Sequence, residues 1–257
     1  MDHRRRLTRL HCGYSFAGMA SSSPATPTQT VDFGRCFRFV VDDPEWLKKI
    51  LIGGAFTLAS ALIVGIFFVA GYWVRLLKRV VAGDPRPLPE WDDLGGIFRD
   101  GLPIVGVYFV YVLGMLAVVA GFGCVGGLVA FGLGGLGRGS HEAADAIGAL
   151  GALGFAGFYV VFIILGLVLS VYLPAAFVRV ALSGEFKDGF DWRANVAFIR
   201  ANLANYALSL VFYLVAHFVA QFGVVLCCVG VFPCAFWAHL ILCFGLGETV
   251  RLNPRSV

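Results

Sequence analysis

Charged residues are scarce in this sequence, and long stretches contain none. Lys, Arg, Asp and Glu together make up 14% of the 257 residues, whereas about 25% is usual in a soluble globular chain. Several uncharged runs are longer than the roughly 18 residues that indicate a membrane helix. This scarcity excludes an ordinary soluble domain. It predicts an all-α, polytopic bundle of transmembrane helices with four to six spans, located in the cell membrane.

Motifs for catalysis and for metal binding are missing as well. The sequence has no H-E-x-x-H and no G-x-S-x-G, and its glycine-rich segment 132–139 lacks the Lys-Ser/Thr ending of a phosphate-binding loop. The seven cysteines show no paired C-x-x-C of the zinc type. Carboxylates are nearly absent from the apolar runs, which argues against a proton pump that uses buried Asp or Glu. We therefore predict a non-enzymatic protein without a metal site.

The net charge of +4 is too small to indicate a nucleic-acid partner. The basic residues are interleaved with acidic ones at the ends of the apolar runs, as expected where basic residues are retained on one side of a membrane. The predicted partners are therefore membrane lipids, further copies of the chain, or a larger membrane complex.

Four long apolar runs are present, at residues 50–73, 102–137, 147–178 and 203–247. We read the first as one spanning helix, with a hairpin bent near Gly65 as the alternative. The second is longer than one span requires and rich in glycine, so a turn near residues 121–123 would make it a tight hairpin. The last is long enough for two spans, divided by a turn near residues 227–233.

The first 32 residues differ in composition from the remainder. They combine a basic start with a segment rich in Ser, Pro and Thr, which predicts a disordered tail. Met19 is a plausible true start. The chain after this tail divides into a first membrane unit, residues 33–150, and a second, residues 151–257.

An acidic-tryptophan phrase stands ahead of three of the apolar regions. Its tryptophans are Trp46, Trp91 and Trp192, and tryptophan is enriched where a helix meets the lipid boundary. The segments that begin at Trp91 and Trp192 have apolar residues at helical spacing, which predicts two interfacial amphipathic helices. Arg99 and Arg200 occupy matching places on these helices. These two arginines could bind lipid phosphate or an anionic substrate. Alternatively, each side chain only extends to the headgroup region.

The two units resemble each other. Gly83 and Gly184, Trp91 and Trp192, and Leu102 and Leu203 are separated by the same interval of roughly one hundred residues, a self-similarity typical of internal duplication. Membrane transporters are often built from such repeats, with the binding site between them.

Two segments carry a resemblance to a known family. Residues 43–54 (DPEWLKKILIGG) and residues 88–93 (LPEWDD) are similar to the prokaryotic membrane family catalogued as domain of unknown function 4013. The resemblance covers residues 33–251 and implies a prokaryotic cytoplasmic membrane protein. The family has no assigned activity, so the resemblance implies a topology and no mechanism.

Two histidines lie within the last apolar run. If this run is a hairpin, His217 and His239 reach similar depths on neighbouring helices, where facing histidines can ligate haem or a pigment. Hydrogen bonding to Gln221 or to a carbonyl is the simpler interpretation. The first functional hypothesis is a scaffold or complex subunit without a cofactor. A small-molecule or lipid transporter with a site between the repeats is the second, and a haem- or pigment-holding subunit is the third.

Overall fold

The computed structural model describes residues 30–136, 141–225 and 229–257. Within these ranges every regular element is helical, which confirms the all-α prediction. The α-helices are α1 Phe33–Val41, α2 Trp46–Ala59, α3 Val64–Val81, α4 Leu94–Leu136, α5 His141–Ser183, α6 Trp192–Ala201, α7 Leu203–Gln221 and α8 Val231–Leu252. The predicted tail lies almost entirely outside the described residues.

In the part of the chain that the structure describes, four helical stretches are long and apolar enough to cross a bilayer, and they identify a membrane protein. They are Leu94–Val129, Gly148–Ser183, Leu203–Val225 and Val231–Leu252. The last apolar run divides into α7 and α8, as predicted from its length.

The first apolar run is a helical hairpin, so our preferred single spanning helix is wrong. Helix α2 ends at Ala59, a short 3₁₀ turn follows, and Ile63 has a positive φ of 69° before α3 begins. Ser60 donates its hydroxyl to the carbonyl of Phe56, which occupies a backbone acceptor in the last turn of α2. A Cβ on Gly65 would collide with the same Phe56 carbonyl, so only glycine allows α3 to turn back this closely.

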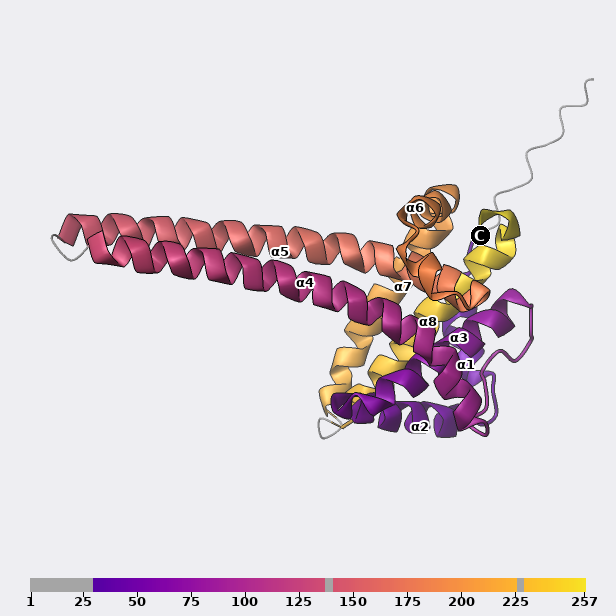
Figure 1. Ribbon diagram of the computed structural model, residues 1–257. Helices are drawn as coiled ribbons and strands as arrows, with labels where there is room; N and C mark the ends of the chain where they lie inside the picture. Colours follow the sequence, from indigo (N-terminus) through magenta and orange to yellow (C-terminus); the bar gives the residue numbers. More distant parts are fainter. Residues whose placement is uncertain (1–29, 137–140, 226–228) are drawn as a thin grey trace, which may run out of the picture.

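The second run does not turn near residues 121–123, because α4 continues unbroken to Leu136. An apolar helix surrounded by lipid has no alternative partner for its backbone groups, so glycine alone does not end it. The predicted surface helix at residues 91–102 is likewise merged into α4, whereas α6 is separated from α7 at Asn202. Helices α4 and α5 form a long pair, residues 109–136 and 141–171, which we call the arm (Figure 1).

The remaining helices form a body around α8. The side chains of Tyr72 on α3, Phe236 on α8 and Tyr206 on α7 are fully buried in it. Helix α2 approaches α8 closely because Gly53 and Gly54 leave room for Phe236 and for the backbone of Pro233. Figure 1 shows the arm projecting far beyond this body, in a direction that differs from α7 and α8.

Candidate functional site

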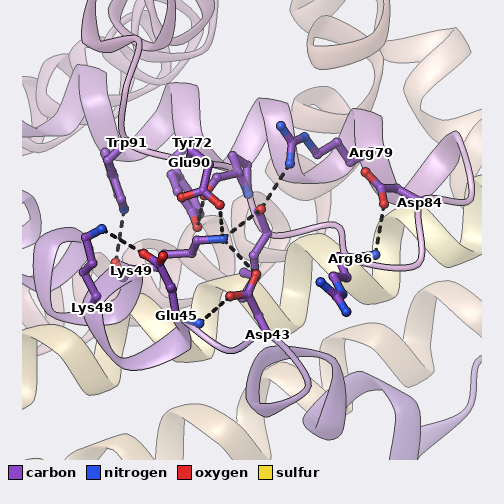
Figure 2. Close-up of polar contacts among 12 residues, drawn as sticks. Asp43, Glu45, Lys48, Lys49, Tyr72, Arg79, Asp84, Arg86, Glu90 and Trp91 are labelled. Carbon is purple, nitrogen blue, oxygen red and sulfur yellow. Dashed lines mark hydrogen bonds and ion pairs between the residues drawn. The ribbon is translucent and has the colours of Figure 1, made fainter.

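The two copies of the acidic-tryptophan phrase lie against each other around Lys49 (Figure 2). The Lys49 side chain is 4% exposed, and its Nζ donates to Oδ2 of Asp43 at 2.8 Å and to the carbonyl of Leu88 at 3.5 Å. Its third contact is an ion pair with Oε1 of Glu90 at 2.5 Å. The phrase ahead of α2 is therefore joined to the loop between α3 and α4. We call Asp43, Lys49 and Glu90 the lysine lock.

Trp91 completes this junction from inside the protein. Its ring lies between Phe56, at 5.0 Å, and Tyr72, at 4.4 Å, and both pairs are stacked. Its Nε1 donates to the carbonyl of Lys49 at 3.2 Å, and the Tyr72 hydroxyl donates to the carbonyl of Pro89 at 3.0 Å. Trp91 thus connects the loop between α3 and α4 to both α2 and α3.

The other two tryptophans of the phrase are placed differently. Trp46 is half-buried against the body, and Trp192 is exposed at the start of α6. The role of Trp46, Trp91 and Trp192 as lipid anchors stays a prediction. For Trp91, packing between two aromatic rings is a sufficient reason for a large aromatic residue at this position.

Lys49 is held as a cation. Burial alone would lower its pKa, but the hydrogen bonds to Asp43 and Glu90 outweigh burial and raise the pKa above its usual value. A nucleophilic or basic lysine requires a depressed pKa and a free lone pair. Because all three N–H groups of Lys49 have acceptors, the lysine lock is suited to fastening the loop rather than to proton transfer.

A second group of charges fastens the start of α4 to α3. Arg75 donates from Nε to Oδ2 of Asp100 and from Nη2 to Oδ2 of Asp93, both at 2.8 Å. The other Asp93 oxygen accepts from the backbone N–H of Gly96 at 2.9 Å, in the first turn of the helix. These hydrogen bonds hold the pKa of Asp93 below its usual value; the bond from Arg75 has the larger effect and the bond from Gly96 the smaller one.

This lowered pKa predicts an acid-sensitive contribution to stability. The contribution is present above the unfolded-state pKa of Asp93, near 3.8, and is lost as the pH falls through the lower folded-state value. We expect Asp93→Asn to be less stable than the wild type at neutral pH and equally stable in strong acid. Thermal unfolding in detergent across this pH range measures the difference. Asp92→Asn is the control, and an equal pH dependence in both variants would contradict the assignment.

The structure brings His217 and His239 together, at the contact of α7 with α8. Their ring centroids are 6.4 Å apart and the rings are perpendicular. His239 Nδ1 lies 2.8 Å from the carbonyl of Ala235, so Nδ1 carries the proton and Nε2 accepts from the Tyr213 hydroxyl at 3.2 Å. The Nε2 atom of His217 lies 3.2 Å from the amide nitrogen of Gln221.

The contacts around the two histidines are those of the simpler interpretation, hydrogen bonding, and haem binding stays a prediction. Each Nε2 atom contacts a protein group, and Trp73 stacks on the His239 ring at 4.7 Å. Among the described residues, no group of three or more His, Cys, Asp or Glu could hold a metal ion. In the described part of the chain, the buried nitrogens without a hydrogen-bond partner include Trp73 Nε1 on α3 and His217 Nδ1 on α7. Both leave donor capacity unused near His239.

Arg99 and Arg200 are both exposed, on α4 and α6. In residues 30–136, 141–225 and 229–257, neither makes an ion pair with an acidic side chain. Their contact with lipid phosphate or with an anionic substrate stays a prediction. The lysine lock was not anticipated from the sequence, because Glu90 is distant in the chain from Asp43 and Lys49, and nothing local distinguishes Lys49 from Lys48.

These helices and internal junctions define a helical membrane protein. The sequence model of the family described as "Protein of unknown function (DUF4013)" matches residues 55–229, about two thirds of the chain, and the protein belongs to this family. The match includes the second acidic-tryptophan phrase and begins just after the first. No curated protein and no solved structure matches the chain.

Proposed function

We propose that the protein is a non-enzymatic, multi-pass protein of the prokaryotic cytoplasmic membrane that assembles with partner helices through the arm. The supporting observation is the open apolar surface of the arm. In an apolar 18-residue window of each span, only 11% of the residues are buried for α4 and none is buried for α5. A surface of this kind must be covered by lipid or by other apolar helices.

The length of the arm favours coverage by protein. The parts of α4 and α5 in the arm, residues 109–136 and 141–171, extend for about 42 and 46 Å at 1.5 Å per residue, whereas the hydrocarbon core is only about 30 Å thick. The average tilt of roughly 20° does not absorb this excess. The arm also leaves the body in a different direction from α7 and α8 (Figure 1). Some of its apolar surface would therefore meet water unless another protein covered it.

The glycines of the arm support the same proposal. A Cβ added at Gly121, Gly123, Gly126 or Gly127 of α4 would meet nothing within 4 Å, and the same holds for Gly151 of α5. These glycines therefore do not lie in the contact between α4 and α5. Small residues on an outer face let a neighbouring membrane helix approach closely.

Bulky residues on this face test the proposal. We expect Gly123→Leu and Gly127→Leu to fold normally, since the added side chains meet open space, but to weaken association by roughly tenfold, equivalent to about 1.4 kcal/mol. The full chain purified in a mild detergent would be measured by native mass spectrometry for self-association and for co-purifying subunits. Val125→Leu, a change on the same helix at an exposed apolar residue, is the control. A wild-type chain that is a monomer without a stoichiometric partner would contradict the proposal.

A duplicated architecture is part of this proposal. Gly83 and Gly184, which end the helical segments before the two matching loops, both have a left-handed φ, 79° and 75°. Each loop leads to a tryptophan, Trp91 or Trp192, near the start of the next helix. The shared backbone geometry at the same interval supports two related units, residues 33–150 and 151–257.

A transporter is the second candidate, supported by the unpaired donors of Trp73 and His217. Trp73 belongs to the first unit, whereas His217 and His239 belong to the second, so these side chains meet between the proposed repeats. Labelling by an aqueous, histidine-reactive reagent distinguishes the two functions. Ready modification of His217 in intact vesicles would favour a water-accessible path, and protection would favour the scaffold.

A further inference from the structure

A cavity of about 270 Å³ lies where α1 meets the end of α8. Its lining includes Asp32, Arg35, Phe244, Glu248 and Arg251. This volume is far larger than the ~30 Å³ that one water occupies in the liquid. The cavity therefore has room for a polar group with several heavy atoms.

Glu248 fixes the two arginines at this cavity. Its side chain is 8% exposed, and its Oε2 accepts from Nη2 of Arg251 at 2.6 Å. Its Oε1 lies 3.6 Å from Nη1 of Arg35, whose guanidinium also lies 5.9 Å from the centre of the Phe244 ring. Both guanidinium groups are thus oriented by a buried carboxylate and an aromatic ring.

The arginines retain donors for a further anion. One carboxylate neutralises one of the two guanidinium charges and occupies only part of their ten N–H groups. Within the described residues, Arg251 Nη1 and Arg35 Nη2 make no hydrogen bond, and the two side chains are 37% and 49% exposed. Paired arginines with free, oriented N–H groups match the geometry of phosphate.

Asp32 adds a negative group to the same cavity. Asp32 is the N-cap residue of α1, and its Oδ1 accepts a hydrogen bond from the N–H of Gly34 at 2.8 Å. The charges of Asp32 and Glu248 balance those of Arg35 and Arg251, so the lining has no net charge. A balanced lining favours a zwitterion over a ligand that is only anionic.

The cavity lies at the polar end of an apolar helix. The candidate span of α8 ends at Leu252, which also lines the cavity, and α1 packs beside it with Cys36 and Val40 buried. The end of a membrane helix is the depth at which lipid headgroups are found.

We infer that this cavity binds the headgroup of a zwitterionic phospholipid that carries a primary ammonium group, such as phosphatidylethanolamine. Its phosphate lies against Arg35 and Arg251, and its ammonium group lies beside Asp32. Inorganic phosphate could bind the same two arginines, so the test distinguishes a lipid phosphate from free phosphate.

Native mass spectrometry of the full chain in detergent tests the inference with phosphatidylethanolamine, with phosphatidylglycerol and with inorganic phosphate. The wild type is expected to retain phosphatidylethanolamine in preference to phosphatidylglycerol. Arg35→Gln should weaken binding of both lipids by about tenfold, because a charge-assisted contact is lost. Asp32→Asn keeps an oxygen for the Gly34 N–H and should abolish the preference between the lipids. Arg38→Gln, an exposed change on the same helix outside the cavity, is the control and should change nothing.

Three results would overturn the inference. They are equal retention of both lipids by the wild type, wild-type binding by Arg35→Gln, and displacement of the lipid by millimolar inorganic phosphate. Because the arm takes no part in this cavity, failure here leaves the proposed assembly function standing. Circular dichroism of each variant confirms that binding is compared between folded proteins.

Discussion

Replacing Gly71 with alanine is expected to separate α3 from α4 and to destabilise the protein by about 3 kcal/mol or more, the upper range for overpacking a core. A Cβ at Gly71 would collide with the carbonyl oxygen of Ile97, and a Cβ at Gly101 would collide with that of Phe67. The two glycines face each other across the crossing. Backbone carbonyls cannot rotate away as side chains can, so the helices themselves would have to move apart.

The effect is measured by titrating the detergent-solubilised protein with a denaturing surfactant. Circular dichroism monitors the loss of helix during the titration. Gly114→Ala is the matched control, because Gly114 lies in α4, the helix that Gly71 faces, and a Cβ there meets nothing within 4 Å. The control should be neutral or slightly stabilising, since alanine favours a helix over glycine by up to about 1 kcal/mol. If Gly71→Ala unfolded at the same surfactant concentration as Gly114→Ala, the close crossing of α3 and α4 would be refuted.

The helical class and the membrane location could be predicted because they depend on the distribution of charge along the chain. The hairpin of α2 and α3 could be given only as the alternative, because its turn contains no proline and only one polar residue, Ser60. The turn is made by Ile63, a β-branched residue with a positive φ, in a place where sequence patterns favour continuous helix. Tertiary contacts of Gly53 and Gly65 select this geometry.

The glycines of the second run were misread for a related reason. In water, a cluster of glycines weakens a helix, and a turn near residues 121–123 was the natural expectation. In an apolar environment the helix is the only local way to satisfy the backbone, so α4 continues through these residues. A Cβ at Gly121, Gly123, Gly126 or Gly127 would meet no atom of α5, so these glycines are not required by the packing of α4 against α5.

The lysine lock was missed because its parts are distant in the sequence. A lysine next to an apolar run is typical of a side chain that extends to the headgroups, and nothing local distinguishes Lys49 from Lys48. Only the fold shows that Lys48 is exposed with Glu45, whereas Lys49 is enclosed with Asp43 and reaches Glu90. Similar phrases at two places were read as two equivalent anchors, and the structure shows them as two halves of one junction.

Replacing Lys49 with methionine is the second change with a large expected effect. It keeps the length of the side chain but leaves the carboxylate of Asp43, 7% exposed, without its cation. Breaking a buried ion pair from one side costs roughly 3–5 kcal/mol, because the remaining charge stays desolvated. The loop that carries Glu90 and Trp91 should also detach from α2, so fluorescence of a variant with Trp91 as its sole tryptophan should report greater exposure to water.

Two companion variants make this result specific. Lys48→Met removes the exposed partner of Glu45 and should change stability little, as expected for a surface ion pair. The double variant Asp43→Asn with Lys49→Met removes both charges and should recover much of the lost stability, since no buried ion remains. A double variant as unstable as Lys49→Met would show that the lysine acts through packing alone. Recovery would show that charge pairing at Lys49 joins the two acidic-tryptophan phrases and thereby sets where α4 leaves the body.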